Sequence, residues 1–234
     1  MRLARRATAN VRLLARGLAA LAFPPACLAC ATALSDDGIP LCPSCLADLD
    51  PVDPAALSAH LSPAATLDSA WAAWYYDPDG PLGALFHAIK YGHRPRYARL
   101  LGRALAPRVA LPPGTDALLP IPLTRVRFLE RGYNQAEELA RGLGETLGLP
   151  VHPDLLRRAA FIRSQTRLGR GARRANVAHA FDAAPEAAGL HLVLVDDVVT
   201  TGATASACVR ALRQAGVRTN AVLVLTSARP HRPG

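Results

Sequence analysis

The chain has almost no lysine, few aromatic residues and no long apolar run. Of its 27 basic side chains only Lys90 is a lysine, and aromatic residues make up 5% of the 234 residues. No stretch approaches the roughly 18 apolar residues of a membrane-spanning helix, so we expect no membrane span. The low aromatic content speaks against a stacking platform for single-stranded nucleic acid. The net charge of +9, nearly all from arginine, either reflects codon bias or suits phosphate or nucleic acid as a partner.

Two common phosphate-binding motifs are absent as well. The chain contains neither the GxxxxGK[ST] of a Walker A loop nor the GxGxxG of a dinucleotide-binding turn. Its first 23 residues are basic, and Arg16 interrupts the apolar run that a signal peptide would need. We therefore expect a cytoplasmic protein whose first twenty residues, within the basic segment 1–23, form a basic amphipathic helix with a surface role or none.

Cysteine is rare outside one short segment. Four of the five cysteines form two CxxC pairs: Cys27, Cys30, Cys42 and Cys45. Secreted disulfide scaffolds are dense in cysteine along their whole length. Two CxxC knuckles in an otherwise cysteine-poor chain favour a structural zinc site of four thiolates, a zinc ribbon. Two disulfides or four free thiols are the alternatives. Cys208, on the apolar face of an expected helix, is predicted to be a small core residue.

Composition divides the chain into four segments. The basic segment 1–23 precedes the zinc ribbon at 24–50, and residues 51–70, rich in alanine, serine and proline, are expected to be a linker. Strands and helices then alternate over 71–230, which predicts an α/β domain with a mostly parallel sheet and helices on both faces. The expected strands are 71–76, 116–121, 151–156, 190–195 and 220–226, and the expected helices are 81–91, 96–109, 135–147 and 205–215. Asn134 and Glu137 resemble a capping box at the start of helix 135–147.

The most informative stretch is 193–204, which reads VLVDDVVTTGAT. An apolar strand is expected to end at Asp196 and Asp197, before a Thr-Thr-Gly-Ala-Thr turn and a helix. Unpaired amides and the dipole at a helix start favour an anion, and Gly202 lets the backbone approach it closely. Carboxylates beside such a turn can accept hydrogen bonds from sugar hydroxyls. The pattern therefore predicts a phosphorylated sugar as the ligand.

This stretch resembles the signature for phosphoribosyl pyrophosphate (PRPP) in type I phosphoribosyltransferases. Other motifs narrow the resemblance: PIPL at 120–123, RGYNQ at 131–135, Arg163-x-Gln165 and Arg174-x-Asn176. Together with the cysteine pairs they are similar to the ComF family of competence-associated, double zinc ribbon proteins, over about 24–228. One departure is the turn after Lys90, which reads YGHRP where the family usually has an acid near Gly92.

The resemblance implies a type I phosphoribosyltransferase-like fold and transfer of phosphoribosyl from PRPP to an unknown acceptor, with release of pyrophosphate and with Mg2+ bound beside the substrate. It assigns Asp196 and Asp197 to the ribose and to charge stabilisation. The implied PRPP-binding residues are Thr200, Thr201, Gly202, Ala203, Thr204, Arg125, Arg131 and Lys90, and the implied flexible-loop residues are Arg163, Gln165, Arg170 and Arg174.

A non-catalytic role is the alternative. The same fold would then bind PRPP or a nucleotide as a signal and contact single-stranded DNA or DNA-uptake proteins. Seven arginines lie between Asp154 and Asp182 with no acid among them. This segment suits a loop that closes over a substrate, a basic solvated loop or a nucleic-acid contact.

Overall fold

The computed structural model describes residues 25–35, 38–53, 57, 69–159 and 180–228. The predicted basic segment 1–23 lies outside these residues. So do the four residues predicted for a flexible loop, Arg163, Gln165, Arg170 and Arg174. Of the predicted linker, residues 51–53, 57, 69 and 70 are described.

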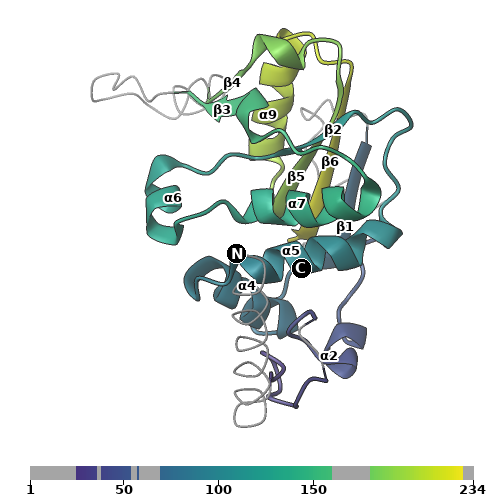
Figure 1. Ribbon diagram of the computed structural model, residues 1–234, viewed down its shortest axis with the longest axis vertical. Helices are drawn as coiled ribbons and strands as arrows, with labels where there is room; N and C mark the ends of the chain where they lie inside the picture. Colours follow the sequence, from purple (N-terminus) through teal and green to yellow (C-terminus); the bar gives the residue numbers. More distant parts are fainter. Residues whose placement is uncertain (1–24, 36–37, 54–56, 58–68, 160–179, 229–234) are drawn as a thin grey trace, which may run out of the picture.

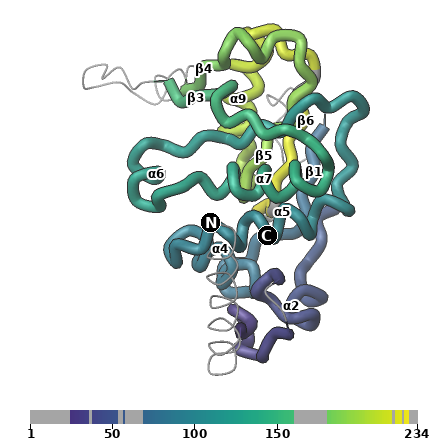
Figure 2. The backbone as a smooth tube through the Cα atoms, in the orientation of Figure 1, coloured from purple at the N-terminus to yellow at the C-terminus, as the bar shows by residue number. Residues whose placement is uncertain are grey.

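Four parallel strands form the central sheet, in the order β1–β6–β5–β2 (Figure 1). The strands are β1 (Ser69–Tyr75), β2 (Ala117–Pro120), β5 (His191–Val199) and β6 (Thr219–Ser227). β5 lies between β2 and β6 and pairs with both. Parallel neighbours need a crossover connection, and Figure 2 shows one: the chain leaves β2, passes through α6 and returns as α7. The predicted parallel sheet is confirmed.

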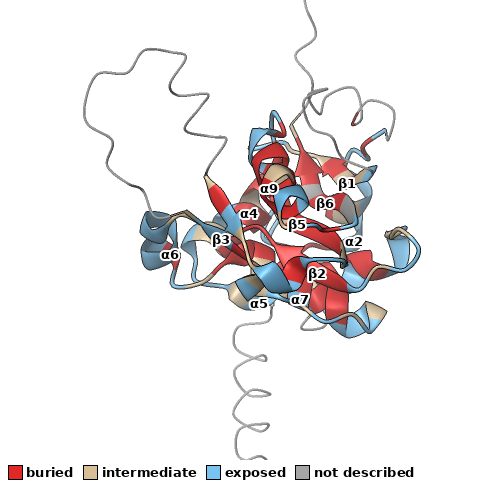
Figure 3. Ribbon diagram, turned by 90° about the horizontal axis from the view of Figure 1, so that it is seen from above, coloured by how far each residue is buried: buried red, intermediate tan, exposed pale blue. Residues whose placement is uncertain are grey.

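Helices cover both faces of this sheet. They are α4 (Pro81–Tyr91), α5 (Pro95–Leu105), α7 (Gln135–Leu147) and α9 (Ala203–Gln214). Because side chains alternate along a strand, Val193 and Val195 of β5 join one core with α4, α5 and α7, whereas Leu192 and Leu194 join a second core with α9. Figure 3 shows the strands buried between these layers. The arrangement confirms the predicted α/β class.

Two of the predicted helices, 81–91 and 135–147, coincide with α4 and α7. The predicted helix 96–109 ends earlier, because α5 is followed by the 3-10 turn η1 (Ala106–Arg108), where Pro107 has no N–H for a helical hydrogen bond. No helix among the described residues is both long and apolar enough to cross a bilayer.

The predicted strand 151–156 is wrong. Val151 makes a single bridge to Leu118, and the chain then turns through the 3-10 segment η2 (Pro153–Leu155). Pro153 cannot donate to a ladder, which ends pairing with the main sheet. A short antiparallel pair follows instead, formed by β3 (Leu156–Arg158) and β4 (Phe181–Ala183), with β4 packed against α9.

The apolar pattern predicts no helix at α6 (Arg125–Arg131), and its burial explains why. Val126 and Leu129 are 65% and 71% exposed, so the helix has no apolar face on the core. Capping contacts at its two ends stabilise the helix instead. The Thr124 side chain accepts a hydrogen bond from a first-turn amide at 3.3 Å, and Gly132 ends the helix with a φ of 77°.

The cysteine-bearing segment attaches to the outer edge of β1. Pro51 forms an antiparallel bridge to Trp74, and the Tyr75 amide donates to the Asp50 carbonyl at 2.8 Å. The short helix α2 (Pro43–Ala47) begins just after the third cysteine. Three of the four clustered cysteines are buried in the same core as α4 and α5. The ribbon segment and the α/β domain therefore share one apolar core.

Candidate functional site

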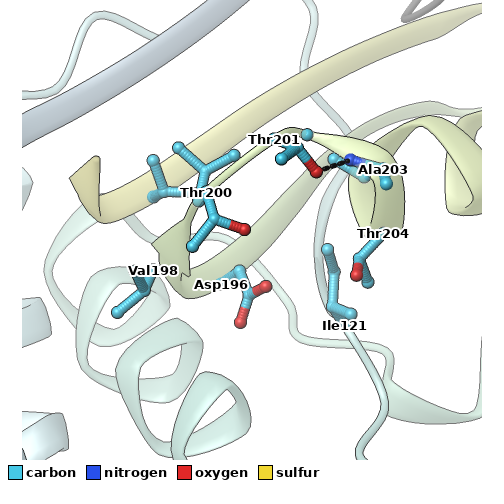
Figure 4. Close-up of a pocket in the computed structure, with 11 residues that line it drawn as sticks. Ile121, Asp196, Val198, Thr200, Thr201, Ala203 and Thr204 are labelled. Carbon is cyan, nitrogen blue, oxygen red and sulfur yellow. Dashed lines mark hydrogen bonds between the residues drawn. The ribbon is translucent and has the colours of Figure 1, made fainter. Parts of the chain in front are cut away.

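The TTGAT turn connects β5 to α9 at the carboxyl edge of the sheet (Figure 4). β5 continues through Val199, so Asp196 and Asp197 lie inside the strand rather than ending it as predicted. Gly202 has a φ of 70°, a conformation that favours glycine, and α9 starts at the next residue. The Thr201 hydroxyl oxygen accepts a hydrogen bond from the Ala203 amide at 3.4 Å. The expected strand, turn and helix start therefore meet here.

A pocket opens at this turn. Its lining comprises the whole of 200–205, Ile121 from the end of β2, Asp196 and Val198 from β5, together with Val199 and Val224. Figure 4 shows the Asp196 carboxylate and the Thr204 side chain bordering the same hollow. One acid thus faces the loop that was predicted to hold a phosphate.

Asp197 points to the opposite face of β5, toward α4. Its carboxylate is 2.7 Å from the Lys90 ammonium, and the residue is only 7% exposed. Burial acts against ionisation of this carboxyl, yet Lys90 holds its pKa below the ordinary aspartate value, and a side-chain hydrogen bond from Gln135 acts in the same direction. The Thr226 hydroxyl donates to the Asp197 carbonyl at 3.1 Å. Asp197 is therefore an ionised, paired carboxylate.

Asp196 behaves differently. Burial and the neighbouring Asp197 carboxylate raise its pKa well above the ordinary value. Its side chain accepts a hydrogen bond from the Asp197 amide at 2.8 Å. The two adjacent acids therefore have opposite electrostatic states, one stabilised as an anion by Lys90 and one held closer to its neutral form.

Of the three basic residues predicted to contact the ligand, the structure brings one directly to the acids. Lys90, in the last turn of α4, pairs with Asp197 and lies 4.8 Å above the Phe86 ring. Arg131 is buried, and its guanidinium donates to the Gln135 side chain at 2.7 Å. Arg125 is exposed on the projecting helix α6.

Arg158 is a basic residue that the motif analysis did not single out. Its guanidinium donates to the Pro122 carbonyl, just after β2, at 3.0 Å and lies 4.6 Å from the Phe181 ring. Burial lowers its pKa, and its field reaches Asp196. The contact with 120–123 forms only when β3 folds against this loop. In the sequence Arg158 is one of seven arginines between Asp154 and Asp182, and nothing there distinguishes it as a residue near the site.

The four clustered cysteines form a candidate metal centre. Their sulfur atoms all lie within 4.8 Å of one another, and Cys30 Sγ is 3.6 Å from Cys42 Sγ. Tetrahedral zinc with Zn–S bonds of about 2.3 Å places its sulfurs about 3.8 Å apart. All four are free cysteines, so two disulfides are not formed. The arrangement fits zinc and leaves no ligand position for a substrate.

Hydroxyl groups flank the cluster. The Ser44 hydroxyl lies 3.1 Å from Cys42 Sγ, and its hydrogen bond, with the Cys45 amide, lowers the pKa of Cys42 to about 6. The nearby Cys42 sulfur in turn raises the pKa of Cys45. A metal ion removes this conflict, because it lets every sulfur bind as a thiolate. Cys208, by contrast, is fully buried in the α9 core, as predicted.

The parallel sheet, the acidic strand and the TTGAT turn at the start of α9 define an α/β protein with a pocket at the carboxyl edge of its sheet. No protein-family model matches the chain. It is 32% identical over 145 residues to DNA utilization protein YhgH of Salmonella typhi, covering 59% of this chain and 64% of that protein. It is 33% identical over 146 residues to competence protein F of Haemophilus influenzae, covering 58% and 64%. These similarities confirm the resemblance to the ComF family.

The aligned part thus spans less than two thirds of the length of these relatives. Among solved structures, the glutamine PRPP amidotransferase from B. subtilis in complex with ADP and GMP superposes with a TM-score of 0.42 and 23% identity, over 56% of this chain and 26% of that one.

The opposite states of the two acids predict opposite effects on stability. Asp197 has a folded-state pKa below its unfolded value, so it stabilises the fold above the unfolded pKa, and this contribution is lost as the pH falls through the folded pKa. Asp196 has a raised folded-state pKa and therefore costs stability at neutral pH. At pH 7 we expect Asp197→Asn to lower the free energy of unfolding by about 3 kcal/mol and Asp196→Asn to leave it unchanged or raise it. Urea unfolding measures both, and equal losses would contradict the assignment.

The cysteine cluster predicts one bound zinc per chain. Cys42→Ser should abolish stoichiometric zinc and lower the melting temperature, because the small ribbon depends on the metal for its folding free energy. Elemental analysis of the purified protein and thermal unfolding with and without a chelator measure this. Cys208→Ala is the matched control and should retain zinc. Metal-free protein that melts at the same temperature as metal-loaded protein would contradict the prediction.

Proposed function

We propose that this chain binds PRPP at the pocket beside the TTGAT turn and transfers its phosphoribosyl group to an acceptor. The observation that carries the proposal is the position of Asp196, whose carboxylate shares one pocket with the first turn of α9. A 5′-phosphate suits the helix start, and a carboxylate in the same pocket suits ribose hydroxyls. The relatives named for competence support the family but do not identify the acceptor.

The two ends of PRPP need different surroundings. The 5′-phosphate would accept hydrogen bonds from backbone amides at 202–205 and from the hydroxyls of Thr200 and Thr204. The pyrophosphate would lie toward the loop that follows β2, where Arg158 is held against the Pro122 carbonyl. Arg158 would supply there the positive charge that a departing pyrophosphate needs.

In the proposed reaction a nitrogen nucleophile of the acceptor attacks C1 of the ribose. The bond between C1 and the pyrophosphate oxygen breaks, and pyrophosphate leaves with the bonding electron pair. The nucleophile's proton passes to a base that the chain's residues do not identify. The transition state is oxocarbenium-like, so the carboxylates stabilise it electrostatically. Mg2+ bound together with PRPP would neutralise charge on the leaving group.

The flexible-loop role of Arg163, Gln165, Arg170 and Arg174 stays a proposal, as does a structural role for zinc. Arg125 stays a proposed PRPP contact. In the present arrangement it is exposed on α6, so it would reach the ligand only from the rim.

Calorimetric titration with PRPP and Mg2+ tests the site. Asp196→Asn and Asp197→Asn should each weaken PRPP binding by about tenfold or more, the first through a lost ligand contact and the second through an unpaired Lys90. Asp154→Asn, an exposed acid outside the pocket, should bind as the wild type does. Equal affinity for PRPP in the wild type and both site variants would contradict the proposal. Pyrophosphate release with a panel of bases and amines then separates a transferase from a binding module.

A second function, contact with single-stranded DNA, is favoured by one surface. Tyr91, the last residue of α4, is 66% exposed, and its ring lies 5.3 Å from that of His87. Nearby, the Arg94 and Arg96 guanidinium groups lie 6.0 and 5.2 Å from the Tyr97 ring. Tyr97 itself is buried, so the exposed ring of this surface is Tyr91, and an exposed ring a few residues before two arginines suits a base and phosphates of a single strand. The relative named a DNA utilization protein is consistent with this role.

Single-strand binding through this surface predicts separable effects. Tyr91→Ala should weaken binding of an oligothymidine by about tenfold through lost stacking. Arg94→Ala should instead reduce the slope of log affinity against log salt by about 0.7, the contribution of one phosphate contact. Arg108→Ala, in the 3-10 turn η1 beyond the far end of α5, is the control. Fluorescence anisotropy across a salt series measures all three, and identical curves for Tyr91→Ala and the wild type would contradict the role of this surface.

A further inference from the structure

The four residues of the cysteine cluster differ in how accessible they are to a small reagent in solvent. Three are buried, since Cys27 and Cys42 are each 3% exposed and Cys45 is 8% exposed, whereas Cys30 is exposed. The backbone explains the difference. The Ala31 amide donates to the Cys27 carbonyl at 2.9 Å, and the turn that this hydrogen bond closes carries Cys30 at the surface. A reagent in solvent therefore meets Cys30 before the other three cysteines.

The exposed cysteine lies directly against a buried one. Cys30 Sγ is 3.6 Å from Cys42 Sγ, a separation at which the two sulfur atoms touch. Cys30 Sγ also donates to the Thr32 hydroxyl oxygen at 3.2 Å. Cysteines that respond to oxidants are accessible and have a second cysteine close by, with which they form a disulfide. Cys30 and Cys42 meet both conditions.

We propose that Cys30 makes the metal centre sensitive to peroxide. Hydrogen peroxide oxidises Cys30, Cys42 closes a disulfide with it, and zinc is released. The proposal rests on zinc binding by the cluster, for which the sulfur positions and the donor set are suited. It does not depend on PRPP binding at the TTGAT turn.

The two chemical steps use one molecule of peroxide. In the first step the Cys30 sulfur attacks one peroxide oxygen, the O–O bond breaks, and Cys30 becomes a sulfenic acid while the other oxygen leaves as water. In the second step the Cys42 sulfur attacks the Cys30 sulfur, an S–S bond forms, and the S–O bond breaks with loss of a second water. Where both cysteines start as metal-bound thiolates, solvent supplies the two protons that these waters need. The site then retains two thiolates, which are too few for a tetrahedral zinc site.

The position of Cys42 links this reaction to the fold. Cys42 is the N-cap of α2, and it belongs with Leu41 and Cys45 to the core that contains α4 and α5. Metal release removes the constraint that joins the two CxxC turns, so we expect oxidised protein to melt at a lower temperature. A dithiol reductant added with zinc should reverse the change, because thiol–disulfide exchange regenerates both cysteines.

Peroxide treatment of the zinc-loaded full chain tests the role of Cys30. A zinc-sensitive dye measures metal release, and peptide mass spectrometry identifies the disulfide. The wild type should release its zinc and form the Cys30–Cys42 disulfide. Cys30→His retains four ligands, because histidine serves with three cysteines in natural zinc sites, but it cannot form this disulfide. We expect it to release zinc at least about tenfold more slowly than the wild type.

Cys27→His is the matched control, since it makes the same exchange at a buried ligand and leaves Cys30 and Cys42 in place. It should release zinc at the wild-type rate. Equal rates in the two histidine variants would overturn the proposal, and so would a disulfide in the oxidised wild type that omits Cys30. Metal-free wild type gives a test without any variant, because Cys30 and Cys42 should be the first thiols lost to peroxide. Wild-type protein that binds no zinc would also overturn the proposal, whatever its affinity for PRPP.

Discussion

The ion pair between Lys90 and Asp197 ties the candidate site together. A carboxylate that is 7% exposed cannot remain ionised without a partner, because transfer of its charge out of water costs several kilocalories per mole. The only lysine of the chain supplies that partner at 2.7 Å, from the end of a helix more than 100 residues away in sequence. α4, β5 and α7 must therefore meet at one point, and the parallel sheet is the scaffold that lets them do so.

This pairing also gives adjacent acids different roles. Alternation along β5 sends Asp197 to the α4 face and Asp196 to the pocket. Lys90 neutralises the buried anion, and Asp196 is left beside the TTGAT turn with a raised pKa. The pair Asp-Asp is thus a structural acid next to a pocket-facing acid. A bound phosphate and sugar would find amides from α9 and a single carboxylate within one small hollow.

The cysteine cluster shares an apolar core with the α/β domain. Pro51 extends the pairing of β1, and Cys27, Cys42 and Cys45 belong to the core that contains α4. Zinc bound there would hold the surface on which α4 rests, and Lys90 is at the end of that helix. The exposed Tyr91 follows directly, so the proposed single-strand surface begins one residue after the lysine that pairs with Asp197. Both proposals therefore depend on how α4 is anchored.

The sequence alone determined the local elements and the chemistry. Apolar periodicity predicted α4 to the residue, and a capping pattern did the same for α7. The CxxC spacing and the VLVDDVVTTGAT stretch predicted the cysteine cluster and the strand, turn and helix around the pocket. Only the tertiary structure decided which acid faces the pocket, that Lys90 pairs with Asp197, that Arg131 donates to Gln135, and that Arg158 lies against the loop after β2. The helix α6 and the pair β3–β4 also escaped prediction. The physical reason is the same in each case: periodicity and spacing record contacts between near neighbours, whereas these pairings depend on long-range packing and on the burial that gives a charge its partner.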